Sequence, residues 1–156
     1  MLLKNSRTLN RIAAIQCIYC HHFTKFKAHK LISDITRIYS KENHENLQEE
    51  LGQEFFLFKL APAYLEGLVL SCLEHENEIN QMISDNLKNN WSLSKIHLIL
   101  LSIIKVGIAE MMFLKSAPFQ VVISEFTDIA GHMLERREVA FVNSIMQKIH
   151  NDTLSS

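Results

Sequence analysis

The sequence predicts an all-α protein, and three observations support this prediction. Four Gly and two Pro in 156 residues are too few for the many turns of an all-β fold. Helix-favouring residues such as Leu, Lys, Glu and Met are plentiful. Hydrophobic residues make up 47% of the chain, which is enough to form one core at this length. We therefore expect a single helical domain over residues 1–156.

The first expected helix, at about 6–22, is apolar almost all the way round. In its segment from Leu9 to Cys20, Gln16 is the polar interruption beyond the head residues Asn10 and Arg11. A helix without a polar face must be surrounded by other helices, so this helix should lie in the core. Arg7 and Arg11 stand one turn apart at its head. We therefore expect a positively charged tip that protrudes from a core element.

Helical patterns continue along the chain, with short loops between them, at about 29–41, 53–60, 62–75, 76–89, 93–115, 118–133 and 136–150. Pro62 opens its helix, because proline is tolerated in a first turn and damages a helix interior. The long central helix follows Ser92 and Ser94, either of which can cap it, and it ends before Pro118.

The central segment from Ile96 to Leu114 is apolar for a length that could cross a bilayer. It contains Lys105 and Glu110, however, and a charge near the centre of a span costs about 2.5 to 3.5 kcal/mol. A buried helix of a soluble protein fits better. At the N-terminus, Met1-Leu2-Leu3 is followed at once by Lys4 and polar residues instead of a long apolar core, which is unlike a signal peptide. We expect a cytoplasmic protein without a membrane span.

The segment Cys17-Ile-Tyr-Cys20-His21 matches the attachment pattern of a c-type haem. It lies inside an apolar helical run of a chain expected to stay in the cytoplasm, where cysteines remain thiols. Buried small residues explain both cysteines more simply. The eight histidines do not pair with these cysteines at zinc-finger spacing. We therefore expect no cofactor and no metal.

The charges are segregated along the chain, although the formal net charge is only −1. Before residue 40, one acidic residue, Asp34, accompanies seven basic ones: Lys4, Arg7, Arg11, Lys25, Lys27, Lys30 and Arg37. From 41 to 90 the balance is acidic. A basic N-terminal third suggests an anionic partner, whereas a run of charge is more often a solvated face. Both interpretations stay open.

The last helix carries a cation, a ring, a hydroxyl and a second cation along one edge. Arg137, Phe141, Ser144 and Lys148 follow at spacings of four, three and four residues, which places them on one side of a helix. Single-stranded RNA is held by this combination, because cations contact phosphates and an unstacked base can lie on a ring. Alternatively, Phe141 belongs to the core and the cations to a solvated rim. Tyr19 on the first expected helix has the same two alternatives: its ring stacks on a base, or its hydroxyl forms a hydrogen bond within the core.

Six short segments follow one another along the chain: Arg7-(x)3-Arg11-Ile-Ala-Ala-Ile-Gln-Cys-Ile-Tyr19; Leu65-Glu-Gly67-Leu-Val with Glu78-Ile79; Trp91; Ile104-Lys105-Val106-(x)3-Glu110; Pro118-Phe-(x)2-Val-Ile-Ser-Glu125-(x)3-Ile129-Ala130; and Phe141-Val142-Asn143-Ser-Ile-(x)2-Lys148-Ile149. In this order the chain resembles the NusB family of bacterial transcription antitermination factors over nearly its whole length. The resemblance implies a compact helical bundle of about seven or eight helices in two small subdomains.

The resemblance also implies RNA binding without catalysis. Members of the family pair with the small-subunit ribosomal protein that acts as NusE, and the pair binds the single-stranded boxA element of nascent ribosomal RNA. That complex helps the elongating RNA polymerase to resist termination and is tied to ribosomal RNA maturation. The implied partners here are therefore boxA RNA, NusE and, indirectly, the elongation complex.

The helix pattern and the resemblance together predict these RNA-binding residues: Lys4, Arg7, Arg11, Tyr19, Arg137, Phe141 and Lys148. Cations would contact phosphates and rings would stack on bases. We expect the positive head of the first helix and the edge of the last helix to converge on one exposed patch. The head carries fewer arginines than is common in relatives, which should weaken binding. Residues 23–53 match the family poorly.

Two other classes of protein are alternatives to an RNA-binding protein. A helical module that forms a homodimer is the alternative, in which RNA binding is weak or conditional. The acidic segment from Glu66 to Glu78 would attract a basic ribosomal protein or form solvated surface. The sequence contains no glycine-rich phosphate loop and no recognisable nucleophile with its base, so we do not expect an enzyme.

Overall fold

The computed structural model describes residues 5–39, 59–88 and 90–155, and all regular structure in these ranges is helical. The α-helices are α1 (Ser6–Thr24), α2 (Ala28–Ile38), α4 (Pro62–Glu74), α5 (Glu76–Asp85), α6 (Leu98–Ile108), α7 (Phe119–Met133) and α8 (Arg136–Leu154). A short 3-10 helix, η3 (Leu93–Lys95), precedes α6, and a π-helix, η4 (Ala109–Leu114), follows it. The all-α prediction is confirmed. The helix expected at 53–60 lies almost entirely outside the described residues.

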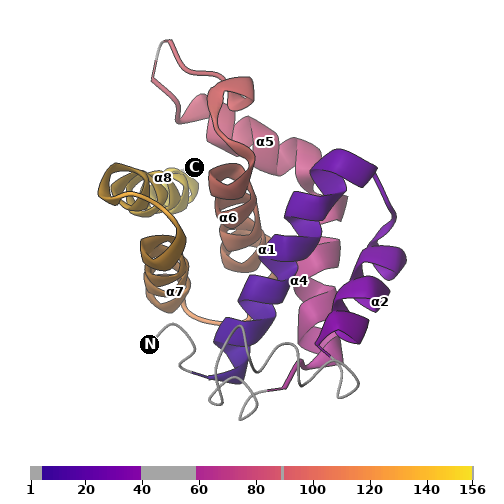
Figure 1. The fold of residues 1–156 in the computed structure, drawn as a ribbon. Helices are drawn as coiled ribbons and strands as arrows, with labels where there is room; N and C mark the ends of the chain where they lie inside the picture. The colour runs from indigo at the N-terminus through magenta and orange to yellow at the C-terminus, as the bar shows by residue number, and fades with distance from the viewer. Residues whose placement is uncertain (1–4, 40–58, 89, 156) are drawn as a thin grey trace.

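Helix α1 lies at the centre of the bundle (Figure 1). It packs against both α4 and α6, while α2 covers α1 and α4, and α7 pairs with α8 beyond α6. Apart from Gln16, all of α1 between Thr8 and Ile18 is buried. The absence of a polar face therefore predicted the position of α1 correctly, because burial on all sides is the way such a helix avoids exposing apolar surface.

The helix expected at 93–115 is divided into three parts in the structure. After η3 the chain is extended at Ile96, and α6 begins only at Leu98. The residue at the N-cap position is His97, whose side chain accepts a hydrogen bond from the Leu100 N–H at 3.5 Å. The expected serine caps are therefore wrong. Ile96 is 4% exposed, so burial of this side chain accompanies the interruption.

The last part of this segment is the wide π turn of η4. Lys115 N–H donates to the carbonyl of Glu110 at 2.7 Å, which closes the segment with a hydrogen bond across five residues. Lys115 itself has a φ of 51°, in the left-handed region. The chain can then turn into α7, and Glu110 is left facing inwards with a fully buried side chain.

The bundle core extends through α6, whose residues from Leu100 to Ile108 are all buried. This burial explains the apolar run that resembled a membrane span in the sequence. In the described part of the chain, no helix is both long and apolar enough to cross a membrane.

Two of the helical glycines, Gly107 and Gly131, should respond differently to alanine. A Cβ atom at Gly107 would lie 2.8 Å from Met146 Cε and 3.2 Å from Phe126 Cγ, whereas a Cβ at Gly131 would meet nothing within 4 Å. Alanine favours a helix over glycine by about 1 kcal/mol, and overpacking a core costs about 1–3 kcal/mol. We expect Gly131→Ala to raise the free energy of unfolding by up to about 1 kcal/mol. The free energy of unfolding of the Gly107→Ala variant should be about 1–3 kcal/mol lower than that of the Gly131→Ala variant, because the added methyl group overpacks the core.

Urea unfolding of the two variants and the wild type measures this difference directly. Equal stabilisation by both substitutions would contradict the tight packing of α6 against α7 and α8.

Candidate nucleic-acid interface

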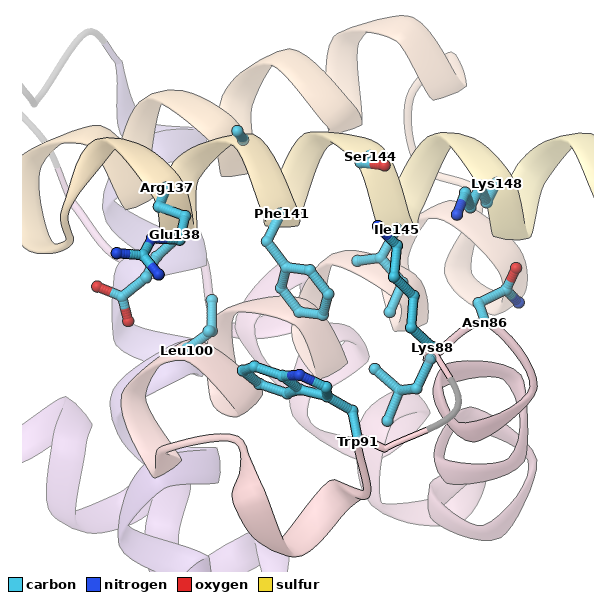
Figure 2. A pocket seen from close by; sticks show the side chains of 12 residues that line it. Asn86, Lys88, Trp91, Leu100, Arg137, Glu138, Phe141, Ser144, Ile145 and Lys148 are labelled. Carbon is cyan, nitrogen blue, oxygen red and sulfur yellow. The ribbon is translucent and has the colours of Figure 1, made fainter.

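A pocket of about 410 Å³ lies between α8, the first turn of α6 and the segment that follows α5. Lys88 and Trp91 line it from the segment after α5, and Arg137, Phe141 and Lys148 line it from α8. Figure 2 shows Phe141 projecting from α8 towards the indole of Trp91, with Leu100 beside them. The volume falls within the range of small-ligand pockets.

The two rings of the pocket form an open apolar platform. The centroids of Trp91 and Phe141 are 6.4 Å apart, and their planes are tilted by 33°. Trp91 is 56% exposed, whereas Phe141 is partly buried and packs against the core. Phe141 thus combines the two alternatives weighed from the sequence, because one ring contacts the core and also lines the pocket. The tilted geometry leaves ring surface that a planar apolar group can contact.

Three cations line the pocket beside these rings. Along α8, Arg137 and Lys148 lie on either side of Phe141, as the helical spacing predicted (Figure 2). From the opposite wall, the Lys88 side chain extends towards α8. An apolar slot with several cations at its rim can hold a flat ring and the negative groups attached to it.

One carboxylate, that of Glu138, lies at the same rim. Its side chain is paired with His97 and accepts from the Glu135 N–H, completing the capping box at the start of α8. The hydrogen bond with His97 and then that with the Glu135 backbone lower the pKa of Glu138 below its usual value. Glu138 therefore stays ionised and fixes the first turn of α8, which carries Arg137.

Arg11 does not belong to an exposed head, because its side chain is buried. It is 1% exposed, and its Nε and Nη2 donate to the two carboxylate oxygens of Glu110 at 2.7 and 3.2 Å. Glu125 lies 3.4 Å from its Nη1. The expectation of a protruding tip is wrong for this residue. A buried guanidinium needs such partners, since its desolvation is otherwise costly.

Glu110 is the common acceptor of this buried cluster. Besides Arg11, the hydroxyl of Ser116 donates to Glu110 at 2.6 Å and that of Tyr64 also donates to it. Burial alone would raise the pKa of Glu110, but the hydrogen bonds from Arg11, Ser116 and Tyr64 lower it below its usual value. The three donors come from α1, from α4 and from the segment after η4. The carboxylate therefore joins three parts of the chain.

Arg7 is exposed and held at the surface beside this cluster. Its Nη1 donates to the carbonyl of Ser116 at 3.1 Å, and its guanidinium lies 5.0 Å from the centroid of the Tyr64 ring. Arg7 can therefore contact an anion from solvent while its position is fixed by neighbours. Tyr19, the ring expected on the same helix, is partly buried and packs edge-on against Phe23. Lys4 lies outside the described residues.

The predicted residues form two separate groups instead of one patch. Arg7 contacts Ser116, just beyond the end of η4, whereas the pocket is built on Leu100, in the first turn of α6. The intervening helical segment separates the two by roughly 20 Å, at 1.5 Å per helical residue. The structure brings Arg137, Phe141 and Lys148 together, and it places Arg7 at the other end of α6 and η4.

The ring of Trp91 and the cation of Lys88 line the pocket but were absent from the predicted site. Trp91 appeared in the sequence only as one segment of a family pattern, and its isolated position gave no helical face to place it on. Lys88 follows the end of α5 without any recognisable motif. The tertiary contact between this segment and α8 was not visible from local spacing.

Residues 8–151 match the NusB family. The chain belongs to this family. A transcription antitermination protein NusB from Rickettsia massiliae (strain Mtu5) is 31% identical over 147 residues, which cover 93% of this chain and 91% of the relative. NusB is a non-enzymatic antitermination factor, so the expectation that the chain is not an enzyme is confirmed by its family.

Solved NusB structures have the same fold. A crystal structure of the antitermination factors NusB and NusE in complex with double-stranded RNA contains a similar chain, with a TM-score of 0.74 and 19% identity over 96% of this chain and 99% of that one. The solution structure of NusB from Aquifex aeolicus has a TM-score of 0.71 and 20% identity over 96% and 90%. The NusB-like fold predicted from the sequence is therefore confirmed.

We expect Glu110→Gln to lower the free energy of unfolding by about 3 kcal/mol, because it leaves the buried Arg11 without its main counter-charge. The low pKa of Glu110 also makes stability depend on pH. Its contribution is complete above the unfolded pKa of about 4.5 and is lost as the pH falls through the lower folded value. Urea unfolding between neutral and acidic pH should show this loss in the wild type and a smaller one in the variant.

Glu78→Gln is the matched control, since Glu78 is exposed and pairs only with the nearby His75 among the contacts described. This change should alter stability by less than about 0.5 kcal/mol. If the two substitutions lower the free energy of unfolding equally, the assignment of Glu110 as the common acceptor of the buried cluster is wrong.

Proposed function

We propose that this chain is an antitermination factor that binds boxA RNA in nascent ribosomal RNA. It acts in the cytoplasm together with a NusE-type ribosomal protein, supports transcription and maturation of ribosomal RNA, and reaches the RNA polymerase elongation complex indirectly. The observation that carries the proposal is the ring-and-cation pocket between Trp91 and Phe141, in a chain of the NusB family.

The pocket would take one unstacked base of a single strand. A base can lie against Phe141 or Trp91, and each base stacked on an aromatic ring contributes about 1–3 kcal/mol. Arg137, Lys148 and Lys88 would contact the adjoining phosphates, which position the strand without reading its sequence. The hydroxyl of Ser144 also lines the pocket and offers a polar contact to a base edge.

Arg7 would provide a second phosphate contact at the other end of α6 and η4. Its fixed position beside Ser116 and Tyr64 reduces the side-chain entropy lost on binding. Arg11 is not part of this proposal, because its guanidinium is already paired with Glu110 in the core. Its role is to hold the start of α1, and thereby Arg7, against η4.

A NusE-type partner is supported by the solved complex of NusB, NusE and RNA that has the same fold. In the acidic segment of this chain, Glu76 pairs with Lys105 and Glu78 pairs with His75. Both carboxylates thus already have partners inside the protein. Glu66 and Glu74 are exposed and are the better candidates for attracting a basic ribosomal protein. Co-purification of the two proteins tests this partner.

The alternative is a homodimeric helical module in which RNA binding is weak or conditional. Sedimentation of the protein with and without boxA RNA separates the two. A monomer that gains mass by one RNA supports the antitermination role, and a dimer unaffected by RNA supports the alternative.

Trp91 is the only tryptophan of the chain, so its fluorescence reports on the pocket. We expect addition of unlabelled boxA RNA to quench this fluorescence, because a base would contact the exposed indole. Phe141→Leu should weaken binding by about 1–3 kcal/mol, or roughly 5- to 150-fold, since leucine keeps an apolar side chain but offers no ring. Fluorescence titration of both proteins at one salt concentration measures the change.

Lys59→Gln serves as the control, because Lys59 is exposed and lies outside both groups of predicted contacts. Its affinity should match the wild type within about twofold, allowing for the loss of one distant charge. Unchanged fluorescence on RNA addition, or equal affinity of the Phe141→Leu variant, would exclude the pocket as the base site.

A further inference from the structure

The turn between α1 and α2 holds two phenylalanines in fixed, exposed positions. Helix α1 ends at Thr24, and Lys25 adopts a left-handed conformation with a φ of 56° while its N–H donates to the His21 carbonyl at 3.0 Å. The Thr24 hydroxyl accepts from the Phe26 N–H at 3.2 Å. These hydrogen bonds define the turn, in which Phe23 precedes and Phe26 follows Lys25.

Phe23 is 63% exposed and Phe26 is 40% exposed. Phe23 meets the ring of Tyr19 edge-on, with centroids 5.1 Å apart, and Lys30 Nζ lies 4.9 Å from the centroid of the Phe26 ring. Single exposed apolar residues are common, but here two exposed rings stand three residues apart in one turn, and a third ring contacts the first. We call Tyr19, Phe23, Lys25, Phe26, Lys27 and Lys30 the junction patch.

The junction patch is strongly positive. Lys25, Lys27 and Lys30 are all exposed, and the sequence from 21 to 33 contains no acidic residue. The nearest acidic residue along α2, Asp34, is shared between Lys30 and Arg37 at 3.1 and 3.3 Å. Exposed rings among lysines, with Asp34 already paired, are suited to a single strand whose bases stack while its phosphates contact cations.

The junction patch lies towards the same end of the bundle as the pocket. Helix α1 runs antiparallel to α6, because Arg7 and Arg11 near its start contact Ser116 and Glu110, which lie beyond the C-terminal end of α6. The C-terminal end of α1 therefore lies towards the first turn of α6, where Leu100 lines the pocket. Figure 1 shows the end of α1 and the segment after α5 in the upper part of the molecule.

We propose that the junction patch binds single-stranded RNA flanking the boxA element. This inference rests on the proposed function, because boxA itself would occupy the α8 pocket. Bases of the flanking strand stack on Phe23 and Phe26, and its phosphates contact Lys27 and Lys30. The patch extends the length of RNA held by one molecule and adds little sequence preference, since stacking and phosphate contacts accept every base.

The test compares two fluorescently labelled RNAs by anisotropy. One is boxA alone, and the other is boxA extended at each end by about ten uridines, a length within the site sizes of single-strand binders. The proteins are the wild type, a ring variant (Phe23→Ser with Phe26→Ser) and a lysine variant (Lys27→Gln with Lys30→Gln). The matched control carries Val121→Ser, another exposed apolar residue, with Lys59→Gln.

We expect the wild type to bind the extended RNA about tenfold more tightly than boxA alone, which corresponds to one stacked base. The ring variant should lose this gain and keep its affinity for boxA alone. For the lysine variant and the extended RNA, the slope of log K against the logarithm of the salt concentration should be shallower by about 1.4. This is the change expected when two phosphate contacts on a single strand are lost. The control should retain the gain.

A wild type that gains nothing from the extension, or variants that keep the gain, would overturn the inference. Loss of NusE co-purification by the ring variant with unchanged RNA binding would also overturn it, and would make the patch a protein-docking surface. Failure of the wild type to bind boxA alone concerns the proposed function instead. In that case, binding of the extended RNA that depends on Phe23 and Phe26 still supports RNA binding by the junction patch. Binding of neither RNA overturns both the proposed function and this inference.

Discussion

One buried carboxylate, that of Glu110, determines how the parts of this fold meet. It receives hydrogen bonds from Arg11 on α1, from Tyr64 on α4 and from Ser116 after η4. Removing such charges from water is unfavourable unless every group finds a partner, and here the guanidinium and carboxylate each find several. The network therefore favours one arrangement of α1, α4 and the end of η4. Arg7 is held at the surface as a consequence, because both of its described neighbours belong to this network or adjoin it.

The sequence predicted those features that depend on local periodicity. The absence of a polar face placed α1 in the core, and the positions of α7 and α8 were close to those observed. It could not predict that Arg11 is buried, because its partner Glu110 is 99 residues away. The start of α6 was also misplaced, since burial of Ile96 and the cap at His97 depend on packing that no short pattern records.

The candidate site shows the same division between local and tertiary information. Arg137, Phe141 and Lys148 share one helix, so their spacing was sufficient to group them. Trp91 and Lys88 complete the pocket from a segment before α6, and only the folded chain brings them opposite α8. The expected convergence with the head of α1 was wrong, because the antiparallel course of α1 along α6 carries Arg7 to the other end. A ligand that touches both groups must be an extended one.

The π turn of η4 also restricts how this region of the chain can change in length. Each residue of a helix rotates the following side chains by about 100°. Deleting one residue between 109 and 114 would preserve a helix, but it would turn Glu110 and Ser116 to different sides and break the contact between them. Insertions and deletions are therefore far less tolerable here than in the short link between α7 and α8, where a glutamate cap can form again at a new position. The contact between Glu110 and Ser116 therefore fixes the number of residues in the π turn.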